Sequence, residues 1–241
     1  MKVFIITGAS RGIGQAMAER LASAGHTLFC ISRTVNEALV RKYGNVHYVP
    51  FDLSCSNGLD GLMKGIAAAV DPQQTETVHL INNAAVVEPL AAIGHCEPDV
   101  IAANVHVNLL APMLLTASLM NHMGRYPAEK RILNVSSASV KYLCPGMSCY
   151  SAAKAGLDTF TRTVALENVR IVSAWPGLID TALQEEARTQ DVSRFAAADT
   201  FAMYKTKGWL KTPEEAAERL IRLLLSDAFG DDPVVEDLYG T

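Results

Sequence analysis

The chain has 241 residues, of which 49% are hydrophobic and 19% are charged, and its formal net charge is −4. Such a chain can bury a sizeable core, which excludes a disordered polymer. The mildly acidic balance argues against nucleic acid as a partner, because general nucleic-acid binders carry a basic excess or a basic stripe. No apolar run reaches membrane-spanning length, and the apolar N-terminus is too short for a signal peptide. We therefore expect a cytoplasmic protein without a membrane partner.

Short apolar runs alternate with longer amphipathic stretches along the chain. The apolar runs have the pattern of strands that are covered on both faces. The expected strands are residues 3–7, 27–32, 46–51, 78–81, 132–135 and 171–174, with 234–235 as a candidate for a final edge strand. The expected helices are residues 14–24, 36–43, 58–70, 99–123, 151–167 and 213–226.

This alternation predicts an α/β fold, a Rossmann-type doubly wound parallel sheet of six to seven strands flanked by helices. No linker, repeat or low-complexity run divides the chain, so we expect a single domain over residues 1–241. The least regular stretch is residues 178–210, after the sixth strand. Ligands of open α/β sheets bind beyond the carboxyl ends of the strands, so this stretch is expected to form a lid over the substrate.

A glycine-rich turn, TGASRGIG, follows the first strand at residues 7–14. Glycine lets the backbone turn tightly and approach a pyrophosphate, and the next helix offers free N–H groups to the anion. The alternative is an ordinary strand–helix turn, but the flanking strand and helix favour a dinucleotide site. The candidate cofactor-binding residues of this turn are Gly8, Ser10, Arg11, Gly12, Ile13 and Gly14.

The charges near this turn bear on which dinucleotide binds. NAD enzymes often place an acid after the second strand, where it binds the ribose 2′-hydroxyl. This chain has Ser32 and Arg33 there, and Arg11 within the turn. Two guanidinium groups suit a 2′-phosphate, which predicts NADP(H) rather than NAD(H). The alternative is two solvated surface arginines.

Tyr150 and Lys154 lie four residues apart, so both project from one face of the expected helix. A nearby ammonium favours the phenolate and is expected to lower the tyrosine pKa, so that the side chain exchanges protons near neutral pH. The alternative is a packed aromatic ring beside the aliphatic stem of a lysine.

Seven motifs in this order resemble the short-chain dehydrogenase/reductase family over nearly the whole chain. They are TGASRGIG (7–14), Asp52, NNAA (82–85), Asn108, NVSS (134–137), YSAAK (150–154) and WPGLIDT (175–181). The resemblance implies that Tyr150 protonates the carbonyl oxygen and that Ser137 hydrogen-bonds the same oxygen. It also implies that Lys154 binds the nicotinamide ribose and lowers the tyrosine pKa, and that Asn108 holds a water that relays protons to Lys154.

The resemblance further implies contacts along the cofactor. These are Asp52, Leu53, Asn83, Ala84 and Ala85 at the adenosine end, Tyr150 and Lys154 at the nicotinamide ribose, and Pro176, Gly177, Ile179 and Thr181 at the nicotinamide end. The family usually has glycine where this chain has Ala85, which puts that one contact in doubt.

Several stretches resemble sepiapterin reductases and bacterial benzil reductases more than other members, which implies a small-molecule dicarbonyl or a pterin or aromatic carbonyl as substrate. The expected substrate contacts are Ser137, Leu143, Met147, Tyr150, Trp175 and Leu178, and a closed lid would add apolar walls from Phe195, Phe201, Met203 and Trp209. The alternative is that the apolar residues of this set are ordinary core and lid material. Glu236 or Asp237 is a candidate anchor for a pterin, although a solvated acidic tail is the stronger interpretation.

Other interpretations stay open beside the ketone reductase. One is an NAD(P)-dependent alcohol dehydrogenase of the same family, which Arg11 and Arg33 disfavour. Another is a non-catalytic nucleotide-sensing protein on the same fold, which has no need of a complete Ser–Tyr–Lys set. The resemblance implies a homodimer or a higher homo-oligomer, because family members commonly pair the two long helices, here residues 99–123 and 151–167, across a dimer interface. The alternative is that both helices are buried within one subunit. The five cysteines are scattered without CxxC spacing, and we expect no metal site.

Overall fold

The computed structural model describes residues 1–239, and it contains one seven-stranded sheet with the order β3-β2-β1-β4-β5-β6-β7. Every neighbouring pair of strands is parallel. The strands are β1 (Lys2–Thr7), β2 (Thr27–Ser32), β3 (Val46–Pro50), β4 (Thr77–Asn82), β5 (Glu129–Val135), β6 (Ile171–Ala174) and β7 (Val234–Val235). The predicted α/β class and the candidate edge strand at 234–235 are confirmed.

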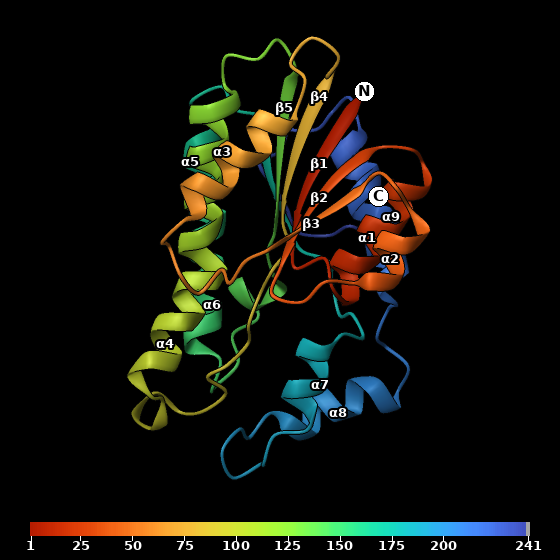
Figure 1. Ribbon diagram of the computed structural model, residues 1–241. Coiled ribbons are helices and arrows are strands. Elements are labelled where there is room, and N and C mark those ends of the chain that lie inside the picture. The colour runs from red at the N-terminus through yellow and green to blue at the C-terminus, as the bar shows by residue number, and fades with distance from the viewer. Residues whose placement is uncertain (240–241) are drawn as a thin grey trace.

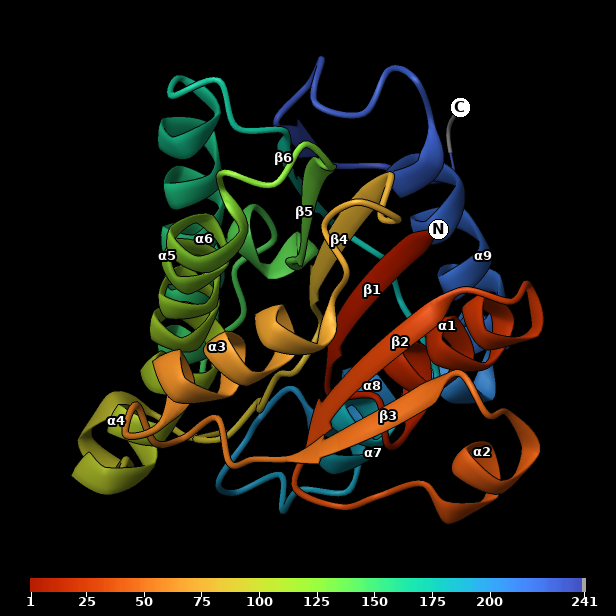
Figure 2. The same ribbon diagram turned by 45° about the horizontal axis from the view of Figure 1, so that its top comes forward.

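Helices cover both faces of the sheet (Figures 1 and 2). On one side lie α1 (Gly12–Ser23), α2 (Glu37–Lys42) and α9 (Pro213–Leu225). On the other lie α3 (Leu59–Ala69), α5 (Ala111–Met123) and α6 (Ser148–Ala165), with α4 (Pro98–Val105) at their lower end in Figure 1. This arrangement leaves only the edges and the two ends of the sheet uncovered.

Alternate residues of the central strands fill two separate cores. On β1, Phe4 and Ile6 pack with α1 and α9, whereas Val3 and Ile5 pack with α3 and α5. Successive side chains of a strand point to opposite faces, so a strand buried on both faces must be apolar throughout. All four of these side chains are fully buried, which explains the unbroken apolar runs of the sequence.

The expected helix over residues 99–123 is a continuous helical stretch of three parts. It runs from α4 through a π-helical turn, His106–Leu110, into α5, and it spans Pro98–Met123. The stretch has 26 residues and a mean hydropathy of 1.6, long and apolar enough to cross a membrane by length and composition. The expectation that no apolar run reaches that length was therefore wrong. This criterion is weak evidence for a membrane, because core helices of soluble proteins meet it too, and α5 contributes four fully buried side chains to the core beside α3.

The segment after β6 lies beyond the carboxyl ends of the strands and is more regular than the sequence indicates. It contains α7 (Ala182–Arg188) and α8 (Ala198–Thr206), which lie below the sheet in Figure 1, at the end opposite the N-terminus. Its two ends are joined: the Lys211 N–H donates to the Leu178 carbonyl (2.8 Å), and the Asp180 N–H donates to the Lys211 carbonyl (2.9 Å). Both helices are short, and α8 is only weakly amphipathic, which is why the sequence pattern did not reveal them.

Candidate active site

A cavity of about 1240 Å³ opens at the carboxyl ends of the strands, between the sheet and the α7–α8 segment. The loops that follow β1, β2, β4, β5 and β6 all contribute to its wall. It is lined by most of the predicted site residues: Gly8, Ser10, Arg11, Gly12, Ile13, Ser32, Arg33, Asp52, Leu53, Asn83, Ala84, Ala85, Ser137, Leu143, Met147, Tyr150, Lys154, Pro176, Gly177, Leu178, Ile179 and Thr181. Asn108, Gly14 and Trp175 do not line it.

The glycine-rich turn is shaped by close approaches that leave no room for side chains. Gly8 has φ +69°, and a Cβ there would lie 2.8 Å from the Ala84 Cα. A Cβ on Gly14 would lie 2.3 Å from the Gly8 carbonyl oxygen and 2.5 Å from Asn83 Nδ2. Gly14 therefore shapes the turn by packing against Gly8 and Asn83, although it does not line the cavity itself. Helix α1 begins at Gly12 without a side-chain cap, so its first N–H groups are available to an anion.

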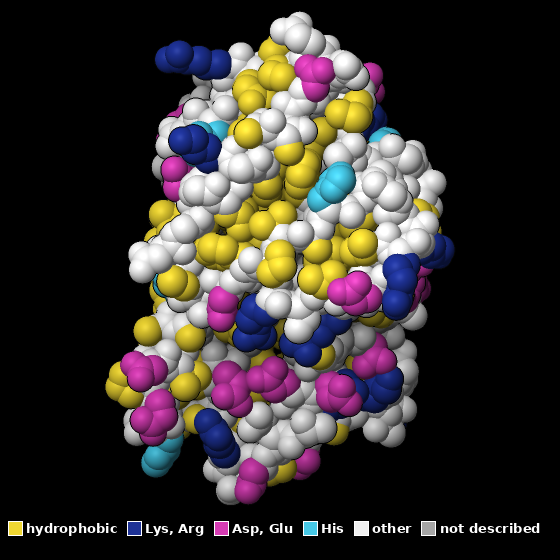
Figure 3. All heavy atoms as spheres, viewed as in Figure 1, with side chains coloured by type: hydrophobic (Ala, Val, Ile, Leu, Met, Phe, Trp, Pro, Cys, Tyr) yellow, Lys and Arg dark blue, Asp and Glu magenta, His cyan; other side chains and the backbone are white. Residues whose placement is uncertain are grey.

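Both arginines predicted to read the cofactor line the same cavity as this turn. Arg33 follows Ser32, whose hydroxyl donates to the Thr34 carbonyl (2.7 Å). Hydrogen bonds from Ser54 lower the pKa of Asp52, and Arg33 acts in the same direction. In Figure 3, basic side chains lie beside a row of acidic ones near the middle of this face of the molecule. The part of the cavity lined by Arg33 therefore combines positive charge with an ionised Asp52.

Helix α6 brings Tyr150 and Lys154 together in the wall of the cavity. Lys154 is 2% exposed, its Nζ donates to the Val135 carbonyl (2.8 Å), and it lies 5.8 Å from the centre of the Tyr150 ring. Burial lowers the pKa of Lys154 to about 8, because charge is costly away from water. The same effect raises the pKa of Tyr150 to about 12, and its hydrogen bond with Ser137 acts in the opposite direction. The expected lowering of the tyrosine pKa by Lys154 is thus absent in this structure, where burial dominates.

Ser137 and Asn108 hold different positions relative to the cavity. Ser137 lines it, and its Oγ accepts from the Ser139 N–H (3.1 Å). Asn108 is fully buried in the π-helical turn, where its amide donates to the Val86 carbonyl (2.7 Å) and to Asn104 Oδ1 (3.0 Å). Val86 lines the cavity, so Asn108 fixes a wall segment from behind.

One predicted substrate contact, Trp175, needs correction, and the two acidic residues considered as pterin anchors are engaged with other groups. Trp175 is 4% exposed and donates its indole N–H to Asp158 Oδ2 (2.9 Å), so it faces the core rather than the cavity. Glu236 pairs with Lys141 (2.9 Å), and Asp237 accepts from the Tyr239 N–H (2.7 Å). Neither acidic residue lines the cavity.

The α7–α8 segment supplies side chains that the sequence did not fully reveal. Of the four lid residues expected to form apolar walls, only Phe201 lines the cavity; Phe195 is fully buried, and Met203 and Trp209 face outward. Ala197, Thr200, Phe201 and Tyr204 line it together. These four residues are spaced like one face of a helix. Once residues 198–206 are known to be helical, this spacing identifies the face of α8 that lines the cavity.

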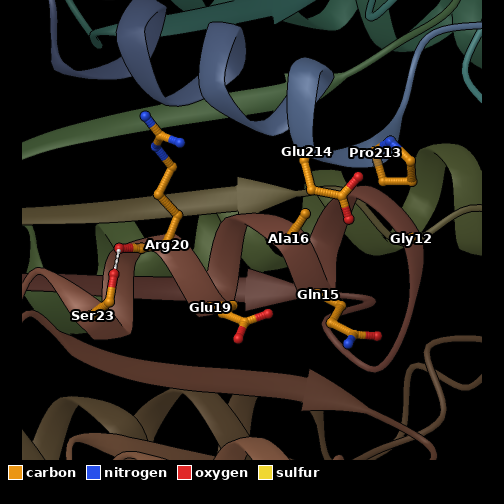
Figure 4. A pocket seen from close by; sticks show the side chains of 8 residues that line it. All are labelled: Gly12, Gln15, Ala16, Glu19, Arg20, Ser23, Pro213 and Glu214. Carbon is orange, nitrogen blue, oxygen red and sulfur yellow. Dashed lines mark hydrogen bonds between the residues drawn. The ribbon is translucent and has the colours of Figure 1, made fainter.

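A second, smaller hollow lies between α1 and α9. It has a volume of about 360 Å³ and is lined by Gly12, Gln15, Ala16, Glu19, Arg20, Ser23, Pro213 and Glu214 (Figure 4). None of the predicted catalytic residues reaches it, and its charged side chains are partly solvated. Among residues 1–239, no group of three or more His, Cys, Asp or Glu side chains is placed to hold a metal ion. The larger cavity is therefore the candidate active site.

The sheet, the glycine-rich turn and the Ser–Tyr–Lys set define an oxidoreductase of the type that uses NAD(P)(H). A model of the short chain dehydrogenase family matches residues 2–192, and the chain belongs to this family.

The chain is 35% identical to a benzil reductase ((S)-benzoin forming) of Bacillus cereus, with 98% of each chain covered. It is 30% identical to a sepiapterin reductase of Xenopus laevis, over 93% of this chain and 91% of that one. A short-chain dehydrogenase/reductase structure from Burkholderia vietnamiensis is 31% identical, with 99% and 97% of the two chains covered and a TM-score of 0.70. The predicted resemblance to benzil and sepiapterin reductases is confirmed.

The close packing at Gly14 makes a direct test of the turn. We expect Gly14→Ala to weaken NADPH binding by about tenfold or more, because the added methyl displaces the Gly8 carbonyl and the N–H groups beside it. Fluorescence titration measures the affinity. Gly61→Ala on α3 is the matched control, because a Cβ there meets nothing within 4 Å. Unchanged affinity in Gly14→Ala would show that the turn does not hold the cofactor.

Proposed function

We propose that this protein is an NADPH-dependent reductase of ketones, with a dicarbonyl or a pterin or aromatic carbonyl as substrate. The observation that carries the proposal is that Ser137, Tyr150, Lys154 and the glycine-rich turn line one cavity. The named activities of the relatives, reduction of benzil and of sepiapterin, support the substrate class. Both compounds carry a carbonyl next to a ring or a second carbonyl, which makes it electrophilic.

Bound NADPH supplies the hydride, and the protein orients and protonates the substrate. The Tyr150 hydroxyl donates its proton to the carbonyl oxygen as negative charge develops there, and the Ser137 hydroxyl donates a hydrogen bond to the same oxygen. With its pKa raised to about 12, Tyr150 remains protonated at neutral pH, as a proton donor must be. Lys154 would hold its charge beside the Tyr150 ring and would bind the ribose hydroxyls of the cofactor. A protonated phenol is the form that acts as the general acid in ketone reduction.

We further propose that residues 178–210 close over the substrate as a lid. Asp180 forms ion pairs with Arg188 on α7 (3.2 Å) and with Lys205 on α8, so both helices are tied to the loop after β6. Leu143 and Leu178 are exposed at the cavity rim, where a flat apolar substrate would cover them. These two apolar residues at the rim support a substrate with an apolar body.

The reaction is tested by following NADPH consumption with benzil, sepiapterin, isatin and simple ketones. We expect turnover of the conjugated carbonyls, and a loss of about 10²–10⁴-fold in kcat for Tyr150→Phe, because the variant has no proton to donate. NADPH affinity should be retained in this variant, since the phenyl ring keeps the packing. Full activity in Tyr150→Phe would overturn the mechanism.

The cofactor preference depends on the arginines at the adenosine end. We expect Arg33→Ala to raise KM for NADPH by about 10–100-fold, the effect of losing charged hydrogen bonds to a phosphate, and to leave KM for NADH nearly unchanged. Initial rates with both cofactors measure this. Arg125→Ala is the matched control, because Arg125 is exposed and does not line the cavity. Equal catalytic efficiency of the unmodified enzyme with NADH and NADPH would contradict the assignment.

We also propose that the protein is a homodimer formed through the stretch Pro98–Met123. Val105, Leu110 and Met113 expose apolar surface along it, and burying such surface stabilises an interface. Light scattering is expected to give twice the chain mass of 26.0 kDa, and Leu110→Glu should shift the population towards monomer. Val192→Glu, an exposed apolar position elsewhere, is the control. A monomeric mass for the unmodified protein would refute the proposal.

A further inference from the structure

Asp158 on α6 is the only buried carboxylate among the described residues, with 4% of its surface exposed. Its oxygens accept hydrogen bonds from the Ser173 hydroxyl (2.5 Å) and from the Trp175 indole N–H (2.9 Å). Both donors are neutral, so hydrogen bonds hold the carboxylate without cancelling its charge. A buried charge of this kind is costly unless an opposite charge lies close to it.

Lys154 is the buried cation on the same helix. Tyr150, Lys154 and Asp158 are spaced four residues apart, which puts them in one row along α6, with about 5–6 Å between successive Cβ atoms. The Cβ atoms of Lys154 and Asp158 are therefore one helical turn apart on the same row of α6.

The sheet register places both groups at the same level above neighbouring strands. Lys154 Nζ donates to the carbonyl of Val135, the last residue of β5, and Val135 pairs with Ala174 on β6. The two donors to Asp158 flank Ala174, one on either side in the sequence. The ammonium and the carboxylate are thus held over adjacent strands by separate hydrogen bonds.

The other charged or titratable groups near this row are engaged elsewhere or exposed. Among charged groups of the elements that pack against α6, Lys141 pairs with Glu236, and His106 lies against Ser56. Asp99 on α4 is exposed. Burial lowers the pKa of Lys154, and Asp158 is the group that acts in the opposite direction.

We propose that Asp158 is a positioning residue for catalysis, whose buried negative charge keeps Lys154 protonated at the pH at which the enzyme works. The proposal rests on the proposed function, because it assigns Asp158 to the Tyr150–Lys154 pair. Asp158 touches neither substrate nor cofactor and acts through the lysine.

The test is the pH dependence of kcat/KM for a ketone at saturating NADPH, in the unmodified enzyme and in Asp158→Asn. The asparagine fits the site, since its amide oxygen accepts from Trp175 and its amide N–H donates to the Ser173 hydroxyl. Only the charge is lost. The folded-state pKa of Lys154 then falls, the ammonium is lost at lower pH, and the alkaline limb of the profile moves down by about one to two pH units. Below that limb, we expect activity close to that of the unmodified enzyme.

Two variants that keep the carboxylate separate the effect of charge from that of packing. Asp158→Glu should restore the alkaline limb towards its original position. Trp175→Phe removes one hydrogen bond to Asp158 and should leave the limb in place. A uniform loss of activity at every pH in Asp158→Asn, with an unmoved limb, would show a purely structural role and overturn the proposal. If the asparagine variant does not fold, Asp158→Ser carries the same expectation for the limb.

A binding measurement distinguishes this proposal from the proposed function. Lys154 is assigned to the ribose hydroxyls, so NADPH affinity should fall as rising pH deprotonates the lysine. In Asp158→Asn this fall should begin at a lower pH than in the unmodified protein. If no ketone is reduced, the proposed function fails, but this titration still tests Asp158. Coincident affinity profiles in the two proteins would overturn the role of Asp158 even in an active reductase.

Discussion

Parallel strands that all end at one edge are the constraint on which the rest of this molecule depends. Parallel strands need crossover connections that return the chain to the same end of the sheet, so loops far apart in sequence meet at the carboxyl ends of the strands. Gly8 follows β1, Asn83 follows β4, Ser137 follows β5 and Pro176 follows β6, and all four line one cavity. The helices supply the apolar cover that lets the central strands stay fully buried. The site exists because the sheet is parallel.

Burial sets the chemical character of the site as strongly as the identity of its residues does. Tyr150 and Lys154 lie on a helix that packs against the sheet, where water has little access. Removal from water favours the neutral form of each group, which raises one pKa and lowers the other. A neutral phenol is ready to give a proton, whereas a charged lysine needs support from its surroundings. Burial therefore favours the form that catalysis needs of Tyr150 and disfavours the form that it needs of Lys154, one turn further along α6.

Features that depend on local pattern were predictable from the sequence. The apolar strands, the glycine-rich turn and the Tyr150–Lys154 spacing each have a short-range signal, and the structure has these elements close to the expected bounds. Trp175 shows what the sequence could not supply. Its motif places it in the loop after β6, but the direction of its ring is decided by Asp158, on a helix whose packing is a tertiary property. The same holds for the pKa of Tyr150, because burial is not a local quantity.

The α7–α8 segment was the least predictable part, since short helices over a cavity have little amphipathic pattern of their own. Sequence order alone showed that it follows β6, but not that its wall residues share one face of α8.

The paired backbone at Leu178, Asp180 and Lys211 gives this segment a modular character. The two ends are fastened to each other at the rim, so the chain enters and leaves the excursion at nearly one point. The entropic cost of closing a loop grows slowly with its length. Here the loop is closed by the backbone pairing at its two ends and not by the residues between them. Insertions, deletions or an exchanged pair of helices between residues 182 and 206 would leave β6 and α9 undisturbed. The range of substrates can therefore change in this fold while the site residues at the carboxyl ends of the strands stay in place.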